Sequence, residues 1–174
     1  TQSRSSAASD VYKRQLIDSA IASAQMRKRL YWTNIHFDAP RDLNICLQDI
    51  LEPHHSGMNP ASLVGRRLNS QGKREDYNKA LNITQCLEIR ENKRKSRCLT
   101  TVEKDNVLSP LPPGRYPDAL SSRQFTYYSL KEYCRLQTLP EGYFRGLVSE
   151  NKAKQLIGNG WTVDIIKHIL GGIK

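Results

Sequence analysis

A long stretch broken by turns, residues 38–123, separates two more regular parts of the chain, and this division most constrains the fold. The stretch holds most of the eight prolines, four of them between positions 110 and 117. Proline cannot donate a hydrogen bond to a helix or a central strand, so short segments joined by loops are predicted here. The flanking residues 16–37 and 124–174 carry the periodic apolar patterns. We therefore expect a regular α/β unit interrupted by a small irregular domain.

The charge balance points to nucleic acid as the first partner to test. The chain has 174 residues, with 27 Lys plus Arg, 17 Asp plus Glu and a formal charge of +10. This charge divides into +2 in residues 1–15, +2 in 16–37, +3 in 38–123 and +3 in 124–174. No apolar run approaches the ~20 residues needed to cross a bilayer, so we expect no membrane association.

Residues 1–15 show neither helical nor strand periodicity, and we leave them out of the expected fold. Their run SSAASDVYKRQ resembles a translated sequencing-adaptor fragment. From this resemblance we expect Leu16 to be the first genuine residue and the true start to lie upstream. The alternative is a natural disordered arm.

The cysteines and histidines do not have metal-ligand spacing. Cys46, Cys86, Cys98 and Cys134 form no CxxC pair, so we expect reduced, mostly half-buried thiols and no metal. The adjacent His54 and His55 precede Ser-Gly, which favours a solvated loop.

Two basic clusters stand out. Arg27, Lys28 and Arg29 lead into residues 30–35, whose aromatic and β-branched composition predicts a mostly buried strand. Residues 90–97 (RENKRKSR) hold five cations and one anion. Each cluster could be a solvated surface, or it could face an anion or a base edge. We expect a strand-like segment over Cys98–Leu108 and a proline-rich loop over residues 109–118.

Three helices are expected in the last part of the chain. Ser129 and Glu132 fit a capping box for a helix that stops before Pro140. A second helix begins at Ser149 and ends at Gly158. A third begins near Thr162, is followed by Gly171, and should present one apolar face composed of Val163, Ile166, Ile169 and Leu170.

Three segments in this order resemble the C-terminal part of a DNA (cytosine-5) methyltransferase, over about residues 16–170. The first is similar to the family's Gln-x-Arg-x-Arg motif at Gln25, Arg27 and Arg29. The second matches at Ser129, Glu132, Arg135, Leu136 and Gln137. The third matches at Gly158, Asn159 and Trp161. The KSRCLTT stretch and the last tryptophan resemble the phage, bacterial and vertebrate de novo branch. The implied fold is the end of an S-adenosylmethionine-dependent methyltransferase sheet plus a small target-recognition domain.

The resemblance implies roles for the first and last motifs. Arg29 would hold O2 of a cytosine flipped out of the duplex, with Arg27 and Gln25 bracing it. For Lys28, a solvent- or phosphate-facing position is favoured. Asn159, Gly160 and Trp161 resemble the end of the cofactor pocket for S-adenosylmethionine, through backbone amides and a flat indole wall. The alternative for Trp161 is a core residue.

The middle region would then read double-stranded DNA. Phosphate contacts are expected from Arg90, Lys93, Arg94, Lys95 and Arg97. The recognition loop is expected at Thr100, Thr101 and Lys104. Val102 stands where the vertebrate branch has a guanine-reading arginine, so base specificity does not carry over.

The nucleophile of the family lies in a Pro-Cys motif, and no cysteine here follows a proline. The glycine-rich cofactor loop and the Glu-Asn motif are also missing. We therefore expect a fragment that is inactive alone, whose partner is the missing N-terminal half. Its expected setting is the cytoplasm of a bacterium or phage-infected cell, in restriction-modification. The alternative is a stand-alone basic DNA-binding module that reads DNA with its last helices. The upstream reading frame discriminates between the two.

Overall fold

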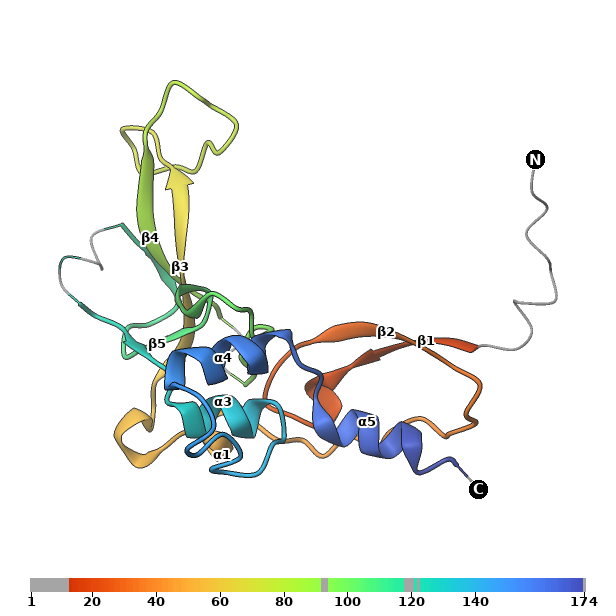
Figure 1. Ribbon diagram of the computed structural model, residues 1–174. Helices are drawn as coiled ribbons and strands as arrows, with labels where there is room; N and C mark the ends of the chain where they lie inside the picture. The colour runs from red at the N-terminus through yellow and green to blue at the C-terminus, as the bar shows by residue number, and fades with distance from the viewer. Residues whose placement is uncertain (1–12, 92–93, 118–120, 122, 174) are drawn as a thin grey trace, which may run out of the picture.

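The computed structural model describes residues 13–91, 94–117, 121 and 123–173, which form two antiparallel sheets and a group of helices (Figure 1). The strands are β1 (Lys13–Asp18), β2 (Lys28–Thr33), β3 (Asn59–Arg67), β4 (Ile83–Ile89), β5 (Val107–Ser109), β6 (Gly114–Tyr116) and β7 (Thr126–Tyr127). The helices are α1 (Leu47–Ile50), α3 (Leu130–Leu136), α4 (Glu150–Asn159) and α5 (Val163–Leu170). Short 3-10 turns are η2 (Ser19–Ile21), η3 (Pro53–His55) and η4 (Glu103–Asp105). The mixed α/β class agrees with the prediction.

The smaller sheet pairs β1 with β2, from Lys13 opposite Thr33 to Asp18 opposite Lys28. Residues 13–15, which we left out of the expected fold, pair with β2. Residues 1–12 lie outside the described residues. The prediction of a mostly buried strand is wrong. Leu30 and Trp32 are 53% and 65% exposed, because α5 packs against only one face of the hairpin.

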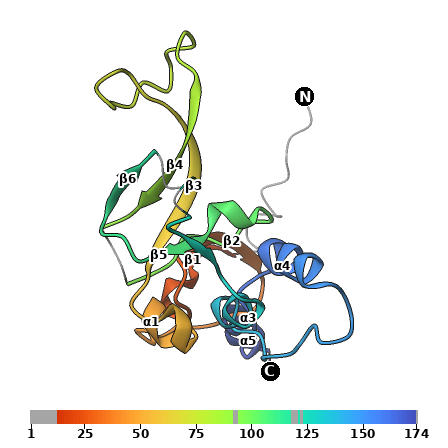
Figure 2. The ribbon, with the colours of Figure 1, turned by 90° about the vertical axis from the view of Figure 1, so that its left-hand side faces the viewer.

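The larger sheet has the order β6-β4-β3-β5-β7 and makes the middle region more regular than its prolines suggested. β3 and β4 pair over seven residue positions, and their hairpin projects from the body of the molecule (Figures 1 and 2). The strand expected over Cys98–Leu108 forms only from Val107, since the preceding residues make a loop and η4. The loop expected over residues 109–118 contains β6.

The three predicted helices are present. Ser129 accepts from the Glu132 amide, and the Glu132 carboxylate accepts from the Ser129 amide, so the capping box of α3 is confirmed. Helix α4 ends one residue beyond the expected Gly158. The expected face of α5 is partly wrong, because Ile165 and Ile169 enter the core while Leu170 is 50% exposed.

His55 is buried rather than solvated, which corrects the loop prediction. Its Nδ1 lies 2.9 Å from Glu132 Oε1, and the backbone amide of Glu52 donates to the same oxygen. The carboxylate that caps α3 thus also fixes the turn after α1.

All four cysteines lie in the described part of the chain as thiols, two half-buried and two buried. In that part, no helix is long and apolar enough to cross a bilayer.

Candidate functional site

The three sequence motifs, far apart along the chain, meet in one buried polar network. Gln25 is fully buried between the two sheets, where its Nε2 donates to the Leu136 carbonyl and to Gln137 Oε1 at 2.9 Å. Its Oε1 accepts from the Leu99 amide at 3.2 Å. One amide side chain therefore joins the first motif to the second and to the loop before β5. We call Gln25, Arg27, Gln137 and Thr162 the motif network.

Gln137 extends this network to the third motif. Its Nε2 donates to the carbonyls of Ile157 and Gly160 at 2.9 and 3.2 Å. Its Oε1 lies 2.9 Å from the hydroxyl of Thr162. The end of α4 and the start of α5 are thus fixed to the residue after α3. Sequence reasoning matched Gln137 to the family motif but gave it no role, because its partners lie at least 20 residues away.

Arg27 is a buried structural residue rather than a surface cation. Its Nη1 donates to the Leu99 carbonyl at 2.8 Å, and its Nη2 donates to the carbonyls of Gly158 and Gly160 at 3.1 and 2.7 Å. Only 3% of the residue is exposed, and burial lowers the pKa of its guanidinium. Backbone carbonyls thus replace much of the hydration that the buried charge has lost.

Arg29, two residues later on β2, lies at the surface. Its guanidinium donates to the Lys28 carbonyl at 2.9 Å, and its Nη2 lies 3.5 Å from Cys98 Sγ. Arg27 Nη1 lies 3.0 Å from the same sulfur. Cys98 therefore sits between the buried and the exposed arginine. Sequence reasoning missed this residue, although its position inside the KSRCLTT stretch was the available signal.

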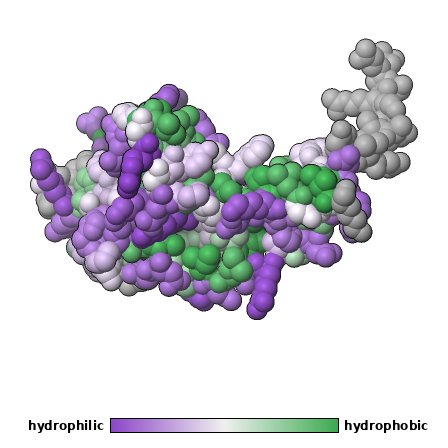
Figure 3. Space-filling model, turned by 60° about the horizontal axis from the view of Figure 1, so that its bottom comes forward, coloured by the Kyte–Doolittle hydropathy of each residue, from purple (hydrophilic) through white to green (hydrophobic). Residues whose placement is uncertain are grey.

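Trp161 is 62% exposed, so the alternative of a core residue is wrong. The indole borders two apolar grooves. One, of about 310 Å³, lies against Leu139 and Phe144, and the other, of about 410 Å³, lies against Arg29 and β2. Figure 3 shows hydrophobic surface at the end of the molecule where β1, β2 and α5 lie. Asn159 is also exposed.

The expectation of free backbone amides at this turn is wrong for three of them. The Gly160 amide donates to Ile157, the Val163 amide to Gln137 and the Asp164 amide to the Thr138 hydroxyl. These three amides are therefore not available to a ligand carboxylate. A carboxylate of S-adenosylmethionine would need other donors.

The loop of residues 98–105, which holds the expected recognition residues Thr100, Thr101 and Lys104, packs against α4. A Cβ added to Gly158 would clash with the Thr100 carbonyl oxygen, so the helix approaches the backbone of the 98–105 loop directly. Lys154 on α4 pairs with Glu103 at 3.2 Å. The Thr100 hydroxyl lies 2.8 Å from Asp105 Oδ2. The loop residues left exposed are Thr101, Val102 and Lys104.

The basic run of residues 90–97 divides into cations with different surroundings. Lys95 was expected to contact phosphate, but its Nζ donates to the carbonyls of Ala20, Ser23 and Ile45 at 2.6, 3.0 and 2.5 Å. This ammonium is therefore structural, and the prediction for it is corrected. Arg94 is exposed, with its Nη2 3.6 Å from Cys46 Sγ. Lys93 lies outside the described residues.

Arg90 and Arg97 border a cavity of about 460 Å³ between β2 and the larger sheet, which we call the basic cavity. Its walls consist of Asp18, Met26, Lys28, Ser62, Val64, Arg90, Arg97, Cys98, Thr100 and Asp105. Three cations face two carboxylates there. Residues from the first motif segment, the basic run and the 98–105 loop thus border the same cavity.

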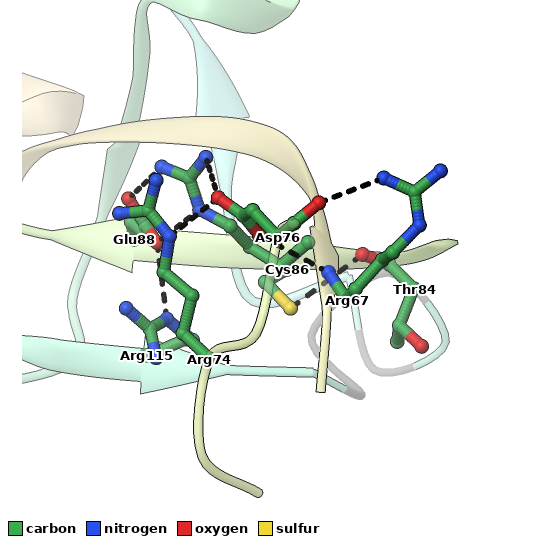
Figure 4. A network of polar contacts seen from close by, with 8 residues as sticks. Arg67, Arg74, Asp76, Thr84, Cys86, Glu88 and Arg115 are labelled. Atoms are coloured by element: carbon green, nitrogen blue, oxygen red, sulfur yellow. Dashed lines mark hydrogen bonds and ion pairs between the residues drawn. The ribbon is translucent and has the colours of Figure 1, made fainter. Parts of the chain in front are cut away.

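A separate ion-pair network stiffens the neighbouring hairpin (Figure 4). Arg66 donates to both carboxylate oxygens of Glu88 at 2.8 and 2.9 Å, and Arg115 donates at 3.0 Å. The Arg66 hydrogen bonds, with those of Arg115, lower the pKa of Glu88 to about 2 despite its partial burial. The guanidinium groups of Arg66 and Arg115 therefore stabilise the larger sheet through Glu88.

Comparison with known proteins relates the fold to methyltransferases. No protein-family model and no curated protein matches the chain. The S. pombe Dnmt2 methyltransferase aligns with a TM-score of 0.53 and 14% identity, over 91% of this chain and 55% of its own. The Entamoeba histolytica methyltransferase EhMeth aligns with a TM-score of 0.53 and 12% identity, over 96% and 56%. The described chain thus has a methyltransferase-like fold and spans little more than half the length of these structures.

Proposed function

We propose that the chain is the target-recognition and cytosine-orienting half of a DNA (cytosine-5) methyltransferase that uses S-adenosylmethionine. The observation that carries this proposal is the motif network. Gln25 and Arg27 join the end of α3 and the turn at Gly160 in one buried set of hydrogen bonds. That convergence leaves Arg29 and Trp161 exposed, and both border the same apolar groove.

The proposed work of Arg29 is to hold a cytosine that has left the duplex. The O2 atom of the base is an acceptor, and a guanidinium donates charge-assisted hydrogen bonds to it. Arg29 is available because Arg27 carries the structural bonds. Cys98 and the Lys28 carbonyl fix the direction of the Arg29 side chain.

The cofactor would lie against the exposed indole of Trp161, where it would supply the methyl group. The apolar groove beside the indole supports an adenine contact, with Gly160 at its edge. Asn159 precedes Gly160 and is exposed. The residues of this chain bind and orient. The cysteine nucleophile of the family would come from elsewhere, since no cysteine here follows a proline.

The remaining half of such an enzyme is the proposed protein partner. Leu16, Leu30, Trp32 and Leu170 are each at least 50% exposed at the end of the molecule formed by β1, β2 and α5. A methyltransferase sheet that continued beside β2 would cover this surface and pair the strand edge. A bacterial or phage origin and a restriction partner remain parts of the proposal.

The test is binding of a fluorescent cytosine-containing duplex to the full chain, followed by anisotropy at low salt. We expect binding, with Arg29→Gln weakening it by about 1–2 kcal/mol. The matched control Arg14→Gln, which removes an exposed cation from the partner strand β1, should change affinity less. Absence of duplex binding would contradict the proposal.

A second measurement concerns catalysis. Incubation of the full chain with duplex and labelled S-adenosylmethionine should give no methyl transfer above background, because the nucleophile is missing. Turnover would overturn the claim that this half is inactive. Sequence-specific binding that is insensitive to Arg29→Gln and lost on substitution of exposed α4 residues would instead support a stand-alone DNA-binding module.

A further inference from the structure

The basic cavity is bordered by a half-buried arginine, Arg97. Arg97 is half-buried, and within the described part of the chain it forms no ion pair with a carboxylate, in contrast to Arg66, Arg115 and Lys154. Lys28 and Arg90 border the same space, and in the described residues they too lack ion pairs. A desolvated cation without an anion is unfavourable.

One oxygen of each carboxylate in the cavity wall already accepts hydrogen bonds from other donors. Asp18 Oδ1 accepts from the backbone amides of Ala20 and Arg27 at 3.1 and 2.9 Å. Asp105 Oδ2 accepts from the Thr100 hydroxyl at 2.8 Å. These bonds hold the wall together. Arg97 borders the cavity without a hydrogen bond from its guanidinium to either carboxylate among the described residues.

Charge repulsion inside the cavity points the same way. Burial lowers the pKa of the Arg97 guanidinium, and the nearby charge of Arg90 adds to this effect, although the carboxylates of Glu88 and Asp105 raise the pKa in part. An anion between the two arginines would relieve both effects. The contrast with Lys95 is informative, because its ammonium has three carbonyl partners and needs no ligand.

We propose that the basic cavity is a phosphate-binding site in which Arg97, with Lys28 and Arg90, holds one backbone phosphate of the bound duplex. This deepens the proposed function, because it names one anchoring residue and separates it from the rest of the basic run. A phosphate held there lies beside Cys98 and therefore beside Arg29. The site would fix the register of the DNA relative to the cytosine-orienting arginine.

Cys98 provides the readout, because its thiol borders the cavity and is half-buried. The full chain is alkylated with iodoacetamide at constant ionic strength, alone, with inorganic phosphate and with a short duplex. Mass spectrometry gives the rate at each cysteine. At ligand concentrations several times the dissociation constant, we expect the Cys98 rate to fall about fivefold while the rate at the half-buried Cys46 is unchanged.

The matched variants are Arg97→Gln, which should abolish this protection, and Lys152→Gln, which removes an exposed α4 cation and should retain it. Thermal unfolding checks that both variants are folded. Protection that survives in Arg97→Gln overturns the site. Duplex binding by anisotropy without protection of Cys98 overturns the site and leaves the proposed function standing. Protection by phosphate from a chain that binds no duplex overturns the proposed function and leaves the anion site standing.

Discussion

The motif network and the basic cavity both contain arginines, but the surroundings of these arginines differ. In the network, Arg27 is buried beside Gln137, and both side chains donate hydrogen bonds to backbone carbonyls, including that of Gly160. In the cavity, Arg97 and Arg90 border open space without carboxylate pairs among the described residues. The difference teaches that a cation satisfied by the protein's own carbonyls is architecture, whereas one left unsatisfied marks a place for a ligand.

Removal of the buried Arg27 guanidinium should cause the largest loss of stability. Arg27→Ala removes the Arg27 hydrogen bonds to the carbonyls of Leu99, Gly158 and Gly160, of which Gly160 keeps only the bond from Gln137. We therefore expect a loss of about 3 kcal/mol or more in the free energy of unfolding. Urea denaturation followed by tryptophan fluorescence measures it. Arg29→Ala is the matched control and should cost about 0.5 kcal/mol or less. Equal losses would erase the distinction between the two arginines.

The contact between α4 and the 98–105 loop can be tested by a substitution that changes no charge. In Gly158→Ala the new Cβ would meet the Thr100 carbonyl, so we expect a destabilisation of about 1–3 kcal/mol. Gly160→Ala is the control, because its Cβ would meet the Ile157 carbonyl oxygen at 3.3 Å. It should cost less than half as much. A neutral Gly158→Ala would show that the loop is not held by the helix.

The Glu88 network gives a smaller, pH-dependent effect. The pKa of Glu88 is lowered from 4.5 to about 2 in the folded protein. The Glu88 carboxylate therefore stabilises the fold above pH 4.5, and this stabilisation is lost as the pH falls toward 2. Glu88→Gln should therefore cost about 1 kcal/mol at pH 7 and progressively less below pH 4.5. Urea unfolding at several pH values checks this. A difference between wild type and variant that stays constant down to pH 2.5 would contradict the ion-pair account.

Local features could be predicted from the sequence, whereas satisfaction of buried groups could not. The capping box at Ser129 and the N-cap at Ser149 depend on neighbours within four residues, and both are present. The exposure of Trp32 depends on which face α5 covers, which strand periodicity does not reveal. The burial of His55 depends on Glu132, far along the chain. Long-range partners decide these cases.

The same limit applies to the candidate site. A run of cations indicates a basic surface, but nothing in residues 90–97 distinguishes Lys95, capped by three carbonyls, from Arg97. The resemblance to the methyltransferase motifs indicated that Gln25, Arg27 and Arg29 act together. It did not indicate that the first two would be buried in the network and the third exposed. Folding the motifs together makes that separation.

The most direct test of the central claim is the salt dependence of duplex binding by wild type, Arg97→Gln and Lys95→Gln. If Arg97 holds a phosphate and Lys95 holds the protein, the slope of log K against log salt should fall by about 1 for Arg97→Gln and stay unchanged for Lys95→Gln. Lys95→Gln should instead lower the free energy of unfolding by about 1–2 kcal/mol. Equal changes of slope in the two variants would contradict the account.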